Sequence, residues 1–181
     1  MGASGMDTFE TARLTAERLG DHHLADLIAL HLDADVSRYL GGVRSPEITQ
    51  AYLATNMGHW EQHGFGLWVL RTRDGAFAGR AGLRHVFVDD VDAVEVAYTF
   101  RRAAWGRGFA TEITETLIRI GFDTLGLSSL IGVVVIGNTP SCRVLEKAGF
   151  TEKGEVYFHD QRCVLYRRLA AQAPEVSSVR A

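Results

Sequence analysis

The chain has 181 residues, of which 46% are hydrophobic and 23% are charged, and its formal net charge is −3. This length and apolar content fit one globular domain with its own hydrophobic core. The slightly acidic balance argues against general binding to nucleic acids or membrane surfaces, because such binding needs a basic excess.

The sequence also limits where the protein can be located and what its cysteines can do. No apolar run approaches the ~20 residues of a membrane span, and the opening MGASGMDTFE lacks the basic and apolar regions of a signal peptide. We therefore expect a cytoplasmic protein. Cys142 and Cys163 are the only cysteines, so the sequence supports neither a disulfide framework nor a structural zinc site, and we expect both thiols to be reduced.

Hydrophobic periodicity predicts both strands and helices along the chain. Strands are expected at 10–19, 65–73, 76–86, 93–100, 129–136, 150–158 and 162–169, and helices at 21–32, 45–64, 109–127 and 139–149. Asp21 is expected to cap the first helix, and Ser45 the second. Pro46 suits the first helical position of the second helix, and Gly64 ends it.

The strand at 93–100 alternates in polarity. One face carries Val94, Val96, Tyr98 and Phe100, and the other carries Glu95, Ala97 and Thr99. The strand at 129–136 is apolar without alternation, as expected of a strand covered on both sides. The helix between them makes a crossover unit, and hairpins are expected from the strands at 65–73 and 76–86 and from those at 150–158 and 162–169. The predicted fold is α+β, with a mixed, mostly antiparallel sheet.

The segment RRAAWGRGFATE, residues 101–112, places glycines and arginines at the start of a helix. Unpaired N–H groups and a partial positive charge at a helix start favour a bound phosphate. The nucleotide P-loop pattern is absent, and a dinucleotide fingerprint would need a third glycine where Thr111 stands. A glycine-rich turn that merely admits the chain into a helix remains an alternative.

Two motifs in this order resemble the GNAT N-acetyltransferase superfamily. Trp105-Gly106-Arg107-Gly108-Phe109-Ala110 is similar to its acyl-CoA signature, although Trp105 replaces the usual Gln or Arg, and NTPSCRVLEKAGF at 138–150 is similar to a second family segment. Together they look most like the branch of ribosomal-protein N-terminal acetyltransferases. The resemblance implies the GNAT fold, with about seven strands and helices on both faces, as a single domain at 9–169 between flexible termini at 1–8 and 170–181.

The resemblance also implies acetyl-CoA as cosubstrate, with its pyrophosphate held by backbone N–H groups at the helix start and its pantetheine arm between two splayed strands. The implied binding residues are Tyr98, Thr99, Phe100, Arg101, Arg102, Trp105, Gly106, Arg107, Gly108, Phe109, Ala110, Thr111, Asn138 and Ser141. Small residues allow the backbone to approach the phosphates, and the arginines add positive charge. Each arginine can equally be a solvated surface residue, and Asn138 can equally be a helix cap.

Acetyl transfer to an amine needs a neutral amine and a donor to the leaving thiolate. Glu95, on the polar face of its strand, is the candidate base, acting through a water; its alternative role is that of an ordinary polar strand residue. Many family members carry a tyrosine as the acid where this chain has Leu145, so Ser141 is the candidate substitute. Ser141 can alternatively be a residue that bonds to the helix start.

The expected function is acetylation of a primary amine by direct attack on the thioester, with a protein N-terminus as a candidate acceptor. A small amine such as an aminoglycoside or polyamine is the alternative acceptor, and a non-catalytic acyl-CoA-binding module is the alternative class. His59 and His63 are four residues apart, but no third metal ligand is obvious, so no metal is expected. Family and symmetry favour a homodimer.

Overall fold

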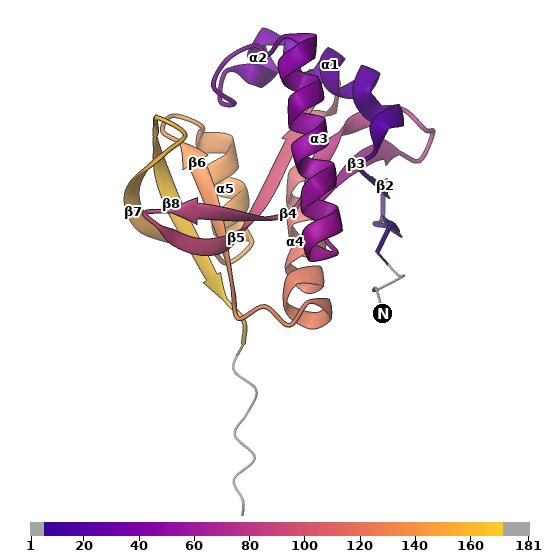
Figure 1. Cartoon of the computed structure of the whole chain (residues 1–181). Coiled ribbons are helices and arrows are strands. Elements are labelled where there is room, and N and C mark those ends of the chain that lie inside the picture. The colour runs from indigo at the N-terminus through magenta and orange to yellow at the C-terminus, as the bar shows by residue number, and fades with distance from the viewer. Residues whose placement is uncertain (1–5, 172–181) are drawn as a thin grey trace, which may run out of the picture.

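A computed structural model describes residues 6–171 of the chain. Most of the two termini that we predicted to be flexible lies outside this range, and Thr8, which we placed in the flexible start, begins a strand. Figure 1 shows a central sheet with helices packed against it. No helix among residues 6–171 combines the length and the apolar character needed to cross a membrane.

Within residues 6–171, eight strands form one sheet in the order β1-β2-β3-β4-β5-β6-β8-β7. They are β1 (Thr8–Glu10), β2 (Leu14–Arg18), β3 (Leu67–Thr72), β4 (Phe77–Val88), β5 (Val91–Phe100), β6 (Ser129–Val135), β7 (Thr151–Phe158) and β8 (Gln161–Leu169). Neighbouring strands are antiparallel except β5 and β6, which are parallel. The mixed, mostly antiparallel α+β fold is therefore confirmed.

The predicted count of about seven strands is one too few, because the segment at 10–19 forms two strands. A turn separates them, in which the Thr11 N–H donates to the carbonyl oxygen of Leu14 (2.9 Å). The chain then reverses, so that β1 pairs antiparallel with β2. A three-residue strand is too short to leave a polarity pattern in the sequence.

The helices are α1 (Leu24–Leu32), α2 (Ala34–Ser37), α3 (Pro46–His63), α4 (Phe109–Arg119) and α5 (Thr139–Lys147). The bounds of α3 are confirmed: the Ser45 hydroxyl accepts from the Ile48 N–H, and Gly64 ends the helix with φ of 72°. Asp21 was wrongly predicted as a cap, since it lies inside a 3-10 turn at Asp21–His23. The unpredicted α2 is capped by the side chain of Asp33.

Helices cover both faces of the sheet. Val96 on β5 belongs to the apolar cluster that includes Phe109, Ile113 and Leu117 of α4. Its neighbour Ala97 belongs to a second cluster, with Leu27 of α1 and Leu53 of α3. Because consecutive strand residues point to opposite faces, α1 and α3 lie on one side of the sheet and α4 on the other (Figure 1). The predicted alternation of 93–100 is confirmed.

The parallel pair β5–β6 is the irregular part of the sheet. The two strands are in register only at Glu95 and Ile131, whereas β4 and β5 stay paired from Gly79–Phe100 to Val88–Val91. Beyond Glu95 the strands therefore separate. This gap in the middle of the sheet positions the candidate site.

Candidate active site

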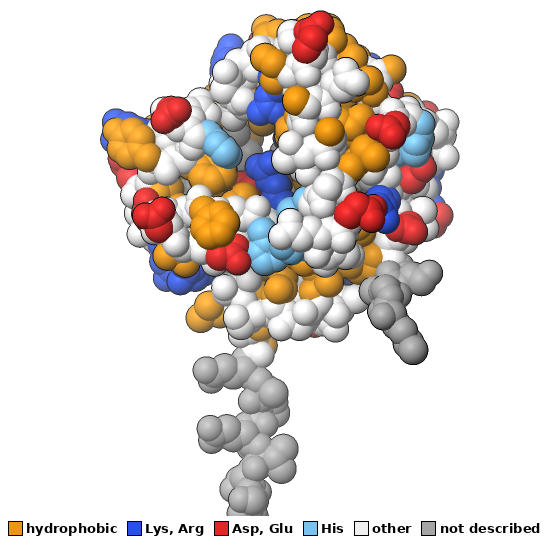
Figure 2. Space-filling model, viewed as in Figure 1, with side chains coloured by type: hydrophobic (Ala, Val, Ile, Leu, Met, Phe, Trp, Pro, Cys, Tyr) orange, Lys and Arg blue, Asp and Glu red, His pale blue; other side chains and the backbone are white. Residues whose placement is uncertain are grey.

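A cavity of about 1370 Å³ opens where β5 and β6 separate. Its walls come from α2 and α3, from β4, β5 and β6, from the starts of α4 and α5, and from the turn between β7 and β8. Figure 2 shows a hollow on this face with basic side chains inside it and histidines near its edge. The volume exceeds the ~300–1,000 Å³ of an ordinary small-molecule site, so there is room for more than one ligand.

One end of the cavity is the glycine-rich loop before α4. Gly106 and Gly108 have φ of 70° and 77°, a left-handed conformation that glycine adopts without strain. A Cβ at Gly106 would meet nothing within 4 Å, so the backbone there is open to a ligand. Helix α4 begins at Phe109 directly after this loop, and its first N–H groups are free to bind an anion.

Arg13 braces this loop from a distant part of the chain. Its Nη1 donates to the carbonyl oxygen of Arg107 (2.6 Å), and its Nε donates to the carboxylate of Glu112 (2.7 Å). Burial opposes the charge on Glu112, but hydrogen bonds from Thr11 and Arg13 outweigh it and hold the pKa of this carboxyl below its ordinary value. Sequence reasoning missed Arg13, because nothing in the local pattern links two residues so far apart.

Most of the residues predicted to bind acetyl-CoA line the cavity. They are Tyr98, Thr99, Phe100, Trp105, Gly106, Gly108, Phe109, Ala110, Thr111, Asn138 and Ser141. Trp105, in the place of the usual Gln or Arg, donates from Nε1 to the carbonyl oxygen of Phe100 (2.8 Å) and stays 50% exposed. Its indole thereby ties the loop to the end of β5.

The three predicted arginines lie outside the cavity wall. Arg102 forms ion pairs with Asp33 (2.8 Å) and Asp35 (2.9 Å) of the α2 region. The guanidinium of Arg107 lies 4.6 Å from the ring centre of Phe109, and Arg101 is exposed. The structure thus brings the backbone of the loop to the cavity and leaves these side chains at its outer side.

Glu95 lies in the cavity wall beside the single β5–β6 pairing and is only 5% exposed. Its Oε2 accepts from Nε of Arg84 on β4 (2.9 Å). The pair is cross-strand, because Arg84 is the register partner of Glu95. The guanidinium of Arg84 thus compensates for the burial of this carboxyl group.

The start of α5 forms the opposite wall. Asn138 caps this helix, with its side-chain oxygen 3.5 Å from the Ser141 N–H, so its predicted role as a cap is compatible with its place in the cavity wall. The Tyr98 hydroxyl donates to the carbonyl oxygen of Ser141 (3.4 Å), and burial raises the pKa of Tyr98 to about 12. Leu145 is buried, with its side chain packed over Gly132 of β6.

Two histidines at the edge of the cavity have structural partners. His59 Nδ1 is 2.9 Å from the carbonyl oxygen of Phe65, and its Nε2 accepts from the His85 N–H (2.9 Å). Both ring nitrogens of His59 are therefore engaged. The described residues bring another possible set of metal ligands together at Glu17, His22 and His23, but none of these three lines the cavity.

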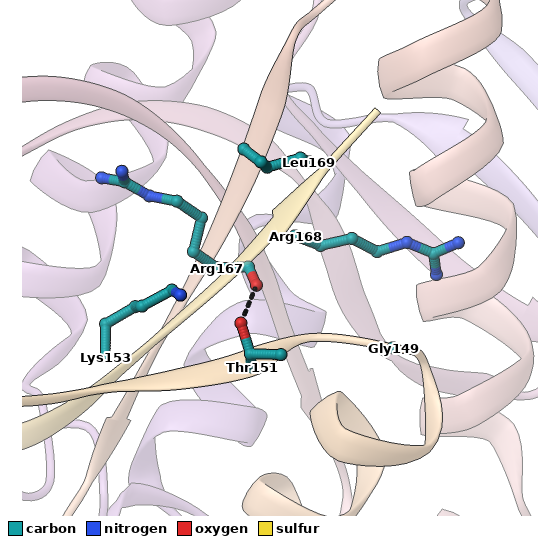
Figure 3. A pocket seen from close by; sticks show the side chains of 6 residues that line it. All are labelled: Gly149, Thr151, Lys153, Arg167, Arg168 and Leu169. Carbon is teal, nitrogen blue, oxygen red and sulfur yellow. Dashed lines mark hydrogen bonds between the residues drawn. The ribbon is translucent and has the colours of Figure 1, made fainter. Parts of the chain in front are cut away.

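A smaller hollow of about 470 Å³ lies apart from the cavity (Figure 3). Lys153, Arg167 and Arg168 surround it, and the Thr151 hydroxyl donates to the carbonyl oxygen of Arg167 (3.2 Å) between β7 and β8. None of the residues that line it also lines the large cavity. It therefore takes no part in the candidate site.

Comparison with known proteins agrees with this geometry. Residues 13–151, more than half of the chain, match the family model described as an acetyltransferase (GNAT) domain. The chain belongs to the GNAT acetyltransferase family. It is thus an acetyl-CoA-dependent N-acetyltransferase, and the GNAT fold predicted from the two motifs is confirmed.

The GNAT relatives include proteins with different acceptors. The uncharacterized N-acetyltransferase YoaA of Bacillus subtilis is 29% identical over 148 residues, which are 80% of this chain and 83% of YoaA. The ribosomal L7/L12 α-N-protein acetyltransferase RimL, solved with coenzyme A, superposes with a TM-score of 0.73 at 16% identity, covering 90% of this chain and 97% of RimL. A spermidine N-acetyltransferase from Vibrio cholerae, solved with coenzyme A and spermine, gives 0.69 at 17% identity, covering 86% and 95%.

Proposed function

We propose that this enzyme acetylates a primary amine held in the large cavity, by direct attack of the amine on the thioester of acetyl-CoA. The observation that carries the proposal is the separation of β5 from β6 beyond Glu95, which leaves an open slot with a buried carboxylate at its inner end. Open strand edges present N–H and C=O groups that can bind an extended ligand with amide groups.

The residues around the slot fit acetyl-CoA. In our proposal, the backbone N–H groups from Arg107 to Thr111 bind the pyrophosphate, since Gly106, Gly108 and the open helix start face the cavity. The edges of β5 at Tyr98–Phe100 and of β6 hold the pantetheine arm, with Asn138 beside it. Arg101 and Arg107 act at longer range through their charge, whereas the charge of Arg102 is offset by Asp33 and Asp35. Acetyl-CoA supplies an activated acyl group.

Glu95 is the proposed base. It accepts the proton that the amine loses, through a water, while the new C–N bond forms and the C–S bond breaks. Arg84 engages its Oε2, which leaves Oε1 for that water. A backbone N–H near Tyr98 polarises the carbonyl, and the Ser141 hydroxyl donates to the departing thiolate, because Leu145 has no proton to give.

The proposed acceptor is a protein N-terminal α-amine or a small amine. The resemblance to RimL supports the first, and the resemblance to the spermidine enzyme supports the second. An α-amine has a reference pKa of about 7.7–8.0, whereas an alkylamine such as lysine has about 10.4, so the first needs less help from a base. A cytoplasmic location and a homodimer complete the proposal.

Calorimetric titration with acetyl-CoA and with CoA, at two salt concentrations, tests this site. We expect micromolar binding that weakens at higher salt, followed by release of CoA thiol when an amine is added. Binding without turnover on any amine would favour a non-catalytic acyl-CoA-binding module. If neither compound binds, both the proposed acetyltransferase site and the non-catalytic acyl-CoA-binding module are contradicted.

A further inference from the structure

The face of the sheet that packs against α3 carries an excess of positive charge. Arg80 and Arg84 of β4 and Arg44, which precedes α3, all line the cavity. Among the described lining residues, the carboxylates are Glu95, paired with Arg84, and Asp35, paired with Arg102 at the rim. The inner part of the cavity therefore has more guanidinium groups than carboxylates.

Arg80 is the member of this group with the fewest polar partners. It is only 3% exposed, and it forms no ion pair with any residue in the range 6–171. Its Nε has no hydrogen-bond partner there either. Burial of a charged side chain without a partner costs several kcal/mol in general, so an arginine in this position is unusual unless a ligand completes it.

Two hydroxyls beside Arg80 lack partners in the same way. Thr99 is the cross-strand register partner of Arg80, and Tyr52 lies under it, with the guanidinium carbon 5.3 Å from the ring centre. Within residues 6–171, Thr99 Oγ1 and Tyr52 Oη are buried and without hydrogen-bond partners, and both residues line the cavity. A guanidinium and two hydroxyls form a set of donors that suits an oxyanion.

The other arginines strengthen this positive site. Arg44 also contacts Tyr52, with its guanidinium carbon 5.1 Å from the ring centre, and its Nη2 donates to the carbonyl oxygen of Leu40 (2.9 Å). Burial, with the charges of Arg84 and Arg44, lowers the pKa of Arg80 from its ordinary value. An arginine nevertheless stays charged in a protein, so the site attracts a negative group.

We propose that the acceptor amine also carries a carboxylate or phosphate group, which Arg80 binds together with Thr99 and Tyr52. The inference rests on the proposed function and deepens it. A polyamine or an aminoglycoside would bring more positive charge against these arginines, which electrostatics disfavours. The acceptor is thus an amino acid-like or amino phosphate-like compound.

The strands also set the length of this acceptor. Arg80 and Arg84, like Thr99 and Glu95, are four residues apart on their strands, which corresponds to about 13 Å along the sheet. The oxyanion is held at the first pair and the amine is activated at the second. The arginine side chain spans part of this distance, and the acceptor must span the rest. An acceptor with several bonds between the amine and the oxyanion therefore fits better than glycine.

The experiment measures kcat/KM with saturating acetyl-CoA on chain-length series of four kinds. These are ω-amino carboxylates from glycine to 8-aminooctanoate, aminoalkyl phosphates, neutral alkylamines and diamines. We expect kcat/KM for one of the two anionic series to exceed that for neutral alkylamines of the same length by at least about 30-fold. We expect the best acceptor in that series to be longer than glycine. The better series identifies carboxylate or phosphate. Preference for neutral amines or diamines overturns the proposal.

The variant Arg80→Gln assigns the effect, with Arg119→Gln on the exposed side of α4 as the matched control. We expect Arg80→Gln to remove the preference for anionic acceptors while the rate on neutral amines and the affinity for CoA stay within about twofold. An equal loss on all acceptors would show a structural role and overturn the proposal. Loss of CoA affinity would place Arg80 in the cosubstrate site and overturn it as well.

Thermal unfolding gives a second readout that needs no turnover. Because Arg80 lacks an acceptor, Arg80→Met is expected to raise Tm by roughly 2–4 °C, whereas a structural arginine would lower it on replacement. With CoA saturating, inorganic phosphate is expected to raise the Tm of the wild type but not that of Arg80→Gln. If no amine is acetylated and CoA does not bind, the proposed function fails, and these Tm values still decide whether Arg80 forms an anion site.

Discussion

Replacement of Glu95 by glutamine tests the chemistry at the centre of the cavity. Glutamine keeps the size of the side chain and an oxygen that accepts from Arg84, so the change removes mainly the negative charge and the proton acceptor. Removal of a general base costs about 10²–10⁴-fold in general. We expect kcat/KM of Glu95→Gln to fall within this range at pH 7.

The size of the loss depends on the acceptor and on the pH. At pH 7 roughly a tenth of an α-amine is already neutral, compared with less than about a thousandth of an alkylamine, given reference pKa values of about 8 and 10.4. The loss in Glu95→Gln is therefore expected to be larger for an alkylamine than for an α-amine. It should shrink as the pH rises toward the pKa of the amine, because the amine then needs no base.

The loss of charge also affects stability, because Arg84 keeps its guanidinium without the carboxylate. Removal of one partner of a fully buried pair costs about 3–5 kcal/mol, but the Arg84 side chain is 23% exposed and the amide oxygen still accepts its hydrogen bond. We therefore expect a destabilisation of about 1–2 kcal/mol, which lowers Tm by roughly 2–8 °C.

Release of CoA thiol, followed from pH 6 to 9 well below the Tm of the variant, measures the effect. Glu115→Gln on the exposed side of α4 is the matched control, with wild-type rate expected at every pH. The affinity for CoA should be unchanged in both variants. If Glu95→Gln acetylates at the wild-type rate throughout this range, Glu95 is not the base. A loss that is the same at every pH, for both kinds of amine, would assign it a purely structural role.

Further predictions concern packing, pH and the proposed acid. Gly82→Ala places a Cβ 2.7 Å from the Cα of Leu67 and should cost roughly 2–4 kcal/mol in urea unfolding, whereas Gly58→Ala, within α3 and with nothing within 4 Å, should add roughly 0.5–1 kcal/mol. Burial, followed by the charges of Arg80 and Arg44, lowers the pKa of His31 from 6.5 to about 3, so the folded state binds fewer protons than the unfolded state. The free energy of unfolding should therefore fall by about 1.4 kcal/mol per pH unit from this residue as the pH decreases below 6.5, and His31→Gln should reduce that slope; an unchanged slope would contradict it. Ser141→Ala should lower kcat about tenfold, and a wild-type kcat would remove Ser141 from the mechanism.

Local chemistry explains which parts of the fold the sequence predicted. The ends of α3 follow from Ser45, Pro46 and Gly64, because a cap, a fixed φ and a left-handed glycine act within one helical turn. The two faces of β5 follow from the alternation of large apolar side chains at Val94, Val96, Tyr98 and Phe100 with smaller or polar ones between them. The strand β1 and the helix α2 are too short to leave such a pattern, so they were missed.

The candidate site was only partly predictable, because it depends on contacts across the sheet. The loop around Gly106 and Gly108 was found from its own residues. In contrast, Arg13 reaches this loop from the turn between β1 and β2, and that contact has no local signal. Arg80 lies in the predicted strand at 76–86, and an arginine in a strand is on its own typical of a solvent-facing residue. The packing of α3 over β4, with Tyr52 against the guanidinium, buries it.

The same sheet face therefore contains both the candidate base and the candidate anion site, and the two differ in how they are satisfied. Arg84 forms an ion pair with Glu95 within the protein, so this side chain needs no ligand to complete its pairing. Arg80 has no such carboxylate within the described chain. The hydroxyl groups of Thr99 and Tyr52 likewise have no hydrogen-bond partner there. An unpaired buried polar group in a folded protein requires an explanation, and a ligand that completes the pairing is one. An acceptor whose oxyanion binds Arg80 would thus compensate for the desolvation of this buried guanidinium, and its amine would be directed along β5 toward Glu95.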